Sequence, residues 1–205
     1  MTSMSHETIE QKLAKYHEFF AIEHDFSINI LPLTEPKSIS FSQFLTNMPT
    51  PFKMASDMSS IDQAALRPLQ ALSGVASQLV EFLNYQSTKI DLLIGYILSQ
   101  QDDEKHRYQG IKFGGGGLLF IAEEPFALAQ LLEMKIFLLT ENCGVFCYGE
   151  VIEVEQQQNN YLHKVIFHFI REEDREVLVR TSLHEQSKQL QALAQKRNQD
   201  SKSTT

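Results

Sequence analysis

The chain has 205 residues, of which 42% are apolar and 21% are charged, and its formal net charge is −8. This composition excludes an intrinsically disordered chain, and the negative charge argues against nucleic-acid binding, which depends on clustered Lys and Arg. No run of residues approaches the roughly 18 apolar positions of a membrane span, and the first residues lack the basic and apolar segments of a secretory signal. We therefore expect a folded cytoplasmic protein with no nucleic-acid partner and no membrane insertion.

The N-terminal part, residues 1–58, is expected to contain a helix, a strand and an irregular connector. Residues 6–21 carry apolar side chains at spacings of four, three and four, which predicts an amphipathic helix. Residues 24–31 alternate apolar and polar side chains, as a half-buried strand does. Prolines at positions 32, 36, 49 and 51 predict that this stretch of the chain lacks regular structure.

Residues 59–103 are predicted to form one long oligomerisation helix. From Ala65 to Ile97, the positions of its main stripe alternate in spacings of four and three without a break. A repeat of 3.5 residues keeps one seam facing a partner helix, so this segment predicts a coiled coil between copies of the chain. The seam residues predicted to form the oligomerisation site are Leu72, Leu79, Leu83, Gln86, Ile90, Leu93 and Ile97. Gln86 is the single polar residue among them and is expected to set the register or the number of helices.

Residues 104–197 are predicted to form a barrel and a closing helix. Five runs rich in Val, Ile, Phe, Tyr and Leu are separated by turn residues and lie at 106–113, 118–122, 134–140, 145–154 and 161–170. With the strand near residue 26 they give six strands, and because no long helix separates the later five, we predict an α+β fold with an antiparallel barrel. A helix is expected after Ile170, over residues 171–197, and residues 198–205 are expected to be a disordered tail.

The glycine run Gly114–Gly117 is a candidate anion site, because successive exposed amides can hold a phosphate. Known phosphate motifs place such glycines before a helix, whereas the residues that follow here have the pattern of a strand. We therefore favour a turn or bulge between two strands over a phosphate cradle.

The two cysteines and seven histidines match no metal-binding spacing. Cys143 and Cys147 are expected to be reduced packing residues. His163 and His168 are an odd number of residues apart in one predicted strand, so we expect them on opposite faces, as surface or rim residues. The acidic residues at 172–176 are expected to be solvated and to stabilise the positive N-terminal end of a helix. No sequence motif of a catalytic nucleophile with its general base occurs. An enzyme whose catalytic groups come together only in the folded chain therefore stays open as an alternative.

Four stretches of the barrel region carry a family resemblance when they are taken in order. The first runs from Lys112 to Phe120, and the others are Tyr148–Val151, Val165–Ile170 and Glu173–Gln186. Together they resemble the PilZ domain, a small six-stranded barrel that receives the bacterial second messenger cyclic di-GMP. The first stretch falls at the family's motif Asp/Asn-x-Ser-x-x-Gly, with Gly117 at its last glycine.

Two departures from the family's pattern affect what the resemblance implies. Lys112 stands at the motif's Asp or Asn and Gly114 at its Ser, and the Arg-x-x-x-Arg pattern before the first strands is reduced to Arg107. Such degenerate motifs, with a long heptad helix before the barrel, are similar to an atypical tetramer-forming PilZ subfamily. The resemblance implies a non-enzymatic bacterial adaptor that forms homotetramers, needs no cofactor and contacts a signalling or motility protein. It also implies weak or lost binding of cyclic di-GMP. The alternative is a genuine receptor that holds cyclic di-GMP through Arg107, Lys112, Gly114 and Gly117.

Overall fold

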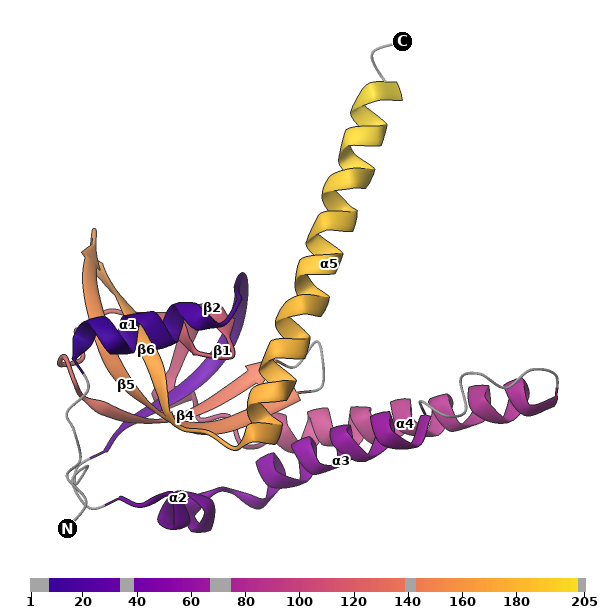
Figure 1. Ribbon diagram of the computed structural model, residues 1–205, viewed down its shortest axis with the longest axis horizontal. Coiled ribbons are helices and arrows are strands. Elements are labelled where there is room, and N and C mark those ends of the chain that lie inside the picture. The colour runs from indigo at the N-terminus through magenta and orange to yellow at the C-terminus, as the bar shows by residue number, and fades with distance from the viewer. Residues whose placement is uncertain (1–7, 34–38, 67–74, 139–142, 203–205) are drawn as a thin grey trace.

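The computed structural model describes residues 8–33, 39–66, 75–138 and 143–202. Its centre is a closed barrel whose neighbouring strands all run antiparallel, in the order β1-β2-β3-β6-β5-β4 (Figure 1). The strands are β1 (Ala21–Pro32), β2 (Arg107–Gly114), β3 (Gly117–Ala122), β4 (Leu131–Leu138), β5 (Cys143–Gln157) and β6 (Asn160–Phe169). The predicted α+β fold with a six-stranded antiparallel barrel is confirmed.

The main core fills the barrel. Alternating side chains of the strands are fully buried in it, among them Phe113, Phe120, Met134, Val145 and Val165. Strand β1 closes the barrel because it pairs with both β2 and β4, although more than 70 residues separate it from β2 in the sequence.

Both cysteines lie on β5 and are buried. Their predicted packing role is therefore confirmed. Burial raises the pKa of the Cys147 thiol well above its ordinary value, so this thiol stays protonated at neutral pH.

A second core lies outside the barrel and consists largely of aromatic rings. Helices α2 (Phe41–Asn47) and α3 (Thr50–Leu66) cover β4 and β5 there. Phe44 of α2 stacks on Phe146 of β5 with ring centroids 5.7 Å apart. We call this group the aromatic cluster; its rings are Phe44, Phe52, Phe137, Phe146 and Tyr148.

The prediction that the chain from 32 to 51 is irregular was wrong for its second half. Helix α2 begins after Ser40, whose side chain forms a capping box with Gln43. Helix α3 begins at Thr50, so Pro51 falls in its first turn. The amides of a first turn have no partner within the helix, and proline therefore fits there without breaking it.

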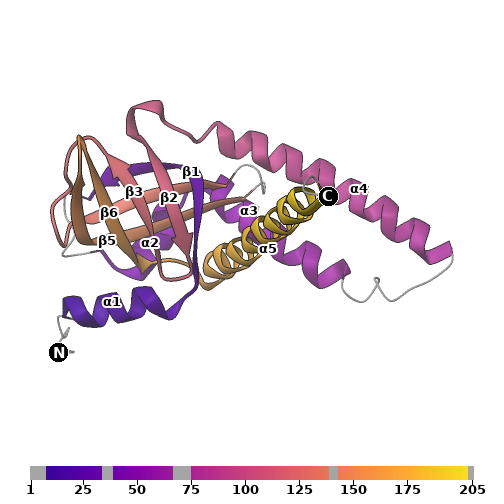
Figure 2. The ribbon, with the colours of Figure 1, turned by 90° about the horizontal axis from the view of Figure 1, so that it is seen from above.

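The prediction of one helix over 59–103 was also wrong. Helix α3 ends at Leu66, and α4 (Val75–Ser99) packs against it and runs back toward the barrel (Figures 1 and 2). The sequence accounts for two helices in place of one, because Pro68 falls between them and proline does not fit the interior of a helix. The predicted seam is thereby divided between two helices, and Leu72 lies outside the described residues.

The two terminal helices lie where they were predicted, but their first and last residues differ from the predicted ones. Helix α1 (Ile9–Glu18) begins at a capping box formed by Thr8 and Gln11. Helix α5 (Glu172–Lys202) starts against the barrel and projects away from it (Figure 1). Residues 198–202, predicted to be disordered, are its last turn, since no Pro or Gly interrupts the helix. Among the described helices, none is long and apolar enough to cross a membrane.

Candidate functional site

Arg107, the first predicted ligand residue, stands at the start of β2 and is already paired. Its guanidinium Nη2 lies 2.7 Å from Oδ2 of Asp102, and its Nε donates a hydrogen bond of 2.9 Å to the same oxygen. The other carboxylate oxygen of Asp102 accepts a hydrogen bond of 2.8 Å from the Asn29 amide. The positive charge of Arg107 is thus already paired with a carboxylate of the same chain.

Lys112, the second predicted cation, lies further along β2 among acidic side chains. It is opposite Glu23 in the pairing of β2 with β1, and it lines a surface hollow together with Glu23, His24, Asp25, Ile111 and Leu119. Two carboxylates beside one ammonium make this hollow unfavourable for an anion. Lys112 stands five positions beyond Arg107 in the strand, which is roughly 16 Å at about 3.3 Å per residue step.

The glycine run forms the turn between β2 and β3, as predicted, and all four of its residues are buried. A Cβ at Gly117 would lie 2.0 Å from the carbonyl oxygen of Val165, and one at Gly114 would lie 2.2 Å from that of Phe20. These glycines permit close packing of backbone on backbone.

Two helices cover this turn. Tyr16 of α1 and the following Phe19 lie against it, since a Cβ at Gly117 or Gly115 would meet their rings at 2.9 Å and 2.6 Å. Arg175 of α5 donates a hydrogen bond to the carbonyl of Gly115 and lies over the Phe19 ring at 5.3 Å. The structure therefore does not bring the four predicted ligand residues together around one open pocket.

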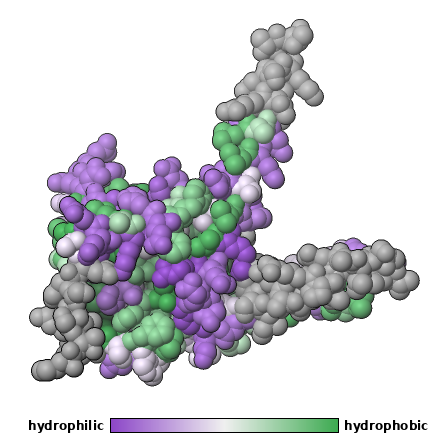
Figure 3. All heavy atoms as spheres, in the orientation of Figure 1, coloured by the Kyte–Doolittle hydropathy of each residue, from purple (hydrophilic) through white to green (hydrophobic). Residues whose placement is uncertain are grey.

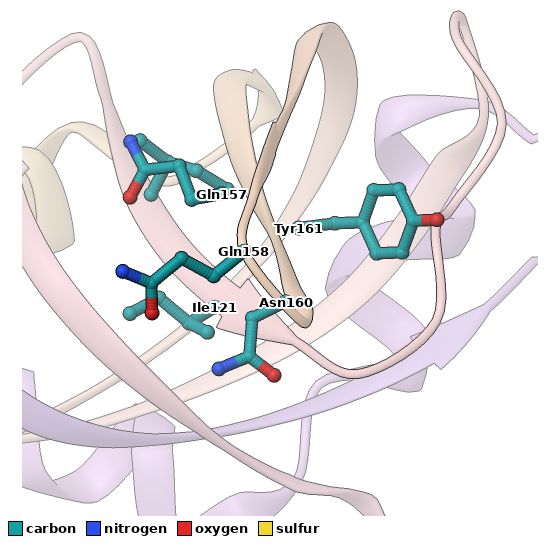
Figure 4. A pocket seen from close by; sticks show the side chains of 6 residues that line it. Ile121, Gln157, Gln158, Asn160 and Tyr161 are labelled. Atoms are coloured by element: carbon teal, nitrogen blue, oxygen red, sulfur yellow. The ribbon is translucent and has the colours of Figure 1, made fainter.

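Another hollow lies beside the hairpin of β5 and β6 (Figure 4). Gln157, Gln158, Asn160 and Tyr161 line it together with Ile121 and Leu162. Its polar side chains are amides and a phenol, so it offers no cation for a phosphate and no carboxylate or imidazole for acid–base catalysis.

A buried polar network joins α3 to the start of α5. Arg171 donates hydrogen bonds of 2.8 Å to Asp174 and 2.6 Å to Ser56, and it pairs with Asp57 at 3.1 Å. The side chain of Asp174 is 1% exposed. Burial raises the pKa of the Asp174 carboxyl, and the hydrogen bonds from Arg171 and Ser56 oppose that rise. The sequence interpretation of 172–176 as a solvated group was wrong for Asp174.

His163 was predicted at the surface or rim and is instead fully buried. Its ring stacks on Phe120 with centroids 4.7 Å apart, and its Nε2 accepts a hydrogen bond of 3.0 Å from the amide of Phe126. Burial lowers the pKa of His163, which favours the neutral ring. His168 is exposed on the opposite face, as predicted.

Helix α4 exposes an apolar surface that the predicted seam only partly describes. Of the predicted seam residues that lie in this helix, Leu79, Leu93 and Ile97 are exposed, whereas Leu83, Gln86 and Ile90 are half-buried. The apolar residues of α4 that are 43–65% exposed are Leu79, Phe82, Tyr85, Leu92, Leu93, Tyr96 and Ile97. Figure 3 shows a small part of this hydrophobic surface at the lower edge of the helical arm. This number of exposed apolar side chains on one helix makes α4 a candidate interaction site.

No group of three or more His, Cys, Asp or Glu that could hold a metal ion occurs within the described part of the chain. The predicted absence of a metal motif was based on spacing, and it stays a prediction for the whole chain.

Two solved structures are similar to this fold. A tetrameric PilZ-domain protein of Xanthomonas campestris, self-assembled through a helical bundle, matches over 87% of this chain and 96% of its own, with 14% identity and a TM-score of 0.52. The inhibitor of motility MotI/DgrA of Bacillus subtilis matches over 83% of this chain, with 9% identity and a TM-score of 0.45. This chain spans about half of that inhibitor, 51% of its length.

No curated protein sequence matches the chain. The model of the PilZ domain family matches residues 81–183, which is half of the chain and includes α5 up to Leu183 together with β2 to β6. The resemblance found in the order of the sequence motifs is confirmed by this match. The chain belongs to the PilZ domain family.

Proposed function

We propose that this protein is a non-enzymatic regulatory adaptor of cyclic di-GMP signalling that works as a homotetramer assembled through α4. In this proposal it binds the cyclic dinucleotide itself weakly or not at all. The observation that carries the proposal is the burial of the glycine turn beneath Tyr16, Phe19 and Arg175. With this turn covered, the protein is expected to act through its surfaces, and α4 exposes an apolar one.

The electrostatics around β2 support weak binding of the ligand. A cyclic dinucleotide carries two phosphates, and each charge-assisted pair with an arginine contributes roughly 1.5–3 kcal/mol. Arg107 is engaged by Asp102, and Lys112 lies beside Glu23 and Asp25. A loss of about 4 kcal/mol weakens binding approximately a thousandfold.

Titration calorimetry of the full chain with cyclic di-GMP at moderate salt is expected to give no saturable isotherm at low-micromolar ligand. Arg107→Ala is expected to leave that result unchanged, because Asp102 already holds this guanidinium. A sub-micromolar dissociation constant that disappears in Arg107→Ala would instead establish the receptor alternative.

Self-assembly is supported by the exposed apolar surface of α4 and by the known assembly of a protein with a similar structure. The Xanthomonas campestris protein covers almost the same length of chain with the same fold and is a tetramer formed through a helical bundle. In this chain, α3 and α4 pack together as a helical arm beside the barrel.

Leu93→Asp is expected to dissociate the oligomer, because Leu93 is 63% exposed in the free chain and a charge there would be buried without a partner on assembly. Light scattering at micromolar concentration should find no monomer in the wild type and a monomer in the variant. Asn84→Asp introduces the same charge at an exposed polar position of α4 and is expected to leave the oligomer intact. Equal masses for wild type and Leu93→Asp would contradict assembly through this surface.

A further inference from the structure

Residues 123–130 form the loop between β3 and β4, and hydrogen bonds attach this loop to the barrel at two places. Near its end, the amide of Ala129 donates a hydrogen bond of 2.8 Å to the carbonyl oxygen of Val151 on β5. Near its middle, the amide of Phe126 donates a hydrogen bond of 3.0 Å to Nε2 of His163 on β6. Of these two attachments, the second depends on a titratable side chain.

This hydrogen bond requires a neutral His163 ring. An imidazole nitrogen that accepts a hydrogen bond carries no proton, so the single proton of the neutral ring is on Nδ1. The ring is fully buried, stacks on Phe120 with centroids 4.7 Å apart and meets the Phe126 ring edge-on at 5.3 Å. Nδ1 has no hydrogen-bond partner within the part of the chain that the structure describes. The contact with the Phe126 amide is therefore the one hydrogen bond of this ring there.

Among the described residues, no carboxylate pairs with the His163 ring. The titratable side chains beside the ring and its contacts are Tyr108 on β2, Glu123 and Glu124 in the loop, Glu153 and Glu155 on β5, and Tyr161 and Lys164 on β6. The three charged residues on β5 and β6 alternate with Val154 and His163, so they lie on the opposite face of the sheet. Glu123 and Glu124 are exposed. Burial and the charge of Glu124 raise the pKa of Tyr108, so this phenol stays neutral. A proton on His163 would therefore have no compensating charge.

Protonation of His163 breaks its contact with the loop. The added proton occupies Nε2, so two N–H donors, one of the ring and one of Phe126, would point at each other. A positive charge would also be buried without a partner, which is unfavourable. Burial lowers the pKa of His163, and the backbone of Tyr161 and Phe120 opposes this shift. The ring regains its ordinary pKa only when Phe126 moves away and water reaches the ring.

We propose that His163 and the amide of Phe126 form a pH-sensitive latch that holds the loop at 123–130 against the barrel and releases it on acidification. Because the pKa of the ring is lower in the closed state than in the open state, the latch is fully closed above the ordinary value of about 6.5 and loosens as the pH falls below it. Release exposes the rings of Phe126 and Tyr108, which are half-buried and pack against the main core when the loop is closed.

Amide hydrogen exchange of Phe126, followed by NMR on the full chain, measures the opening of the latch. After correction for the intrinsic pH dependence of exchange, the opening equilibrium is expected to rise about fourfold from pH 8 to pH 6, because one proton is taken up with an ordinary pKa near 6.5. The strand amides should show no such rise, because the opening is local. An equal rise in the strands would mean that the whole barrel opens, and no rise at Phe126 would mean that the loop ignores pH. Either result overturns the latch.

His163→Gln separates the charge from the hydrogen bond. The glutamine side chain does not titrate, and its oxygen can accept the Phe126 amide in place of Nε2. The opening of this variant is therefore expected to be the same at pH 8 and pH 6. His168→Gln is the matched control, because it removes the exposed histidine of the same strand and should keep the fourfold rise. A fourfold rise in His163→Gln would assign the pH dependence to another group and overturn the latch.

Two further measurements test the hydrogen bond itself. His163→Phe keeps an aromatic ring on Phe120 but removes the acceptor, so the Phe126 amide is expected to exchange faster than in the wild type at pH 8 and to lose its pH dependence. Protection equal to that of the wild type would contradict the role of Nε2. A long-range ¹⁵N correlation spectrum of the wild type at pH 8 needs no variant and is expected to show His163 protonated at Nδ1 alone. A proton on Nε2 at that pH would overturn the geometry of the latch.

Discussion

Replacing Asp174 with Ala is expected to lower the free energy of unfolding by about 3–5 kcal/mol, because the change leaves the Arg171 guanidinium buried without its main partner. For a chain of this size, that loss corresponds to a fall in Tm of roughly 6–20 °C. Thermal unfolding followed by circular dichroism measures it. Ser56 on α3 would lose its acceptor in the same step, so the attachment of the helical arm to α5 should weaken as well.

Glu173→Ala is the matched control for this prediction. Glu173 is the neighbouring acidic residue in the first turn of α5 and is exposed, so its loss is expected to change the free energy of unfolding by no more than about 0.5 kcal/mol. Equal stability losses in the two variants would mean that both carboxylates act through the helix dipole and that the buried network contributes nothing of its own.

The barrel was predictable because its local signals agree with its tertiary structure. Each later strand before β6 is an apolar run closed by Gly, Pro or Asn, and the glycine run is a turn, as its strand context indicates. The pairing of β1 with β2 and β4 was not predictable from periodicity, because no local signal connects strands so far apart in the sequence.

The helical arm shows how a regular spacing can mislead. An alternation of four and three residues fits one long seam, but it continues across Pro68, and the chain forms two packed helices in its place. Part of the predicted seam, including Leu83 and Ile90, then became half-buried within the chain. The proline was the signal that could have corrected the prediction.

The candidate site depended on contacts that are distant in the sequence. Nothing local indicates that Asp174 meets Ser56 or that Tyr16 covers Gly117. His163 was accessible to sequence reasoning, because it has the same strand parity as Val165 and Phe167, both of which face the core.

Gly117→Ala is expected to destabilise the fold by about 3 kcal/mol, at the upper end of the usual cost of overpacking. The added Cβ would lie 2.0 Å from the carbonyl oxygen of Val165, and this neighbour is backbone in the adjacent strand β6. The strands can relieve the contact only by moving apart, which weakens the pairing of β3 with β6.

The same experiment separates the two interpretations of the glycine run. Lys112→Ala, on the same hairpin but directed to the surface hollow, is expected to stay within about 0.5 kcal/mol of the wild type. Denaturant unfolding of the two variants without ligand measures both effects. If the glycines served mainly to present amides to a phosphate, Gly117→Ala would unfold like the wild type and lose only ligand affinity. A large loss of stability in the absence of ligand is what the packing of β3 against β6 requires, because the glycine is then part of the barrel's closure.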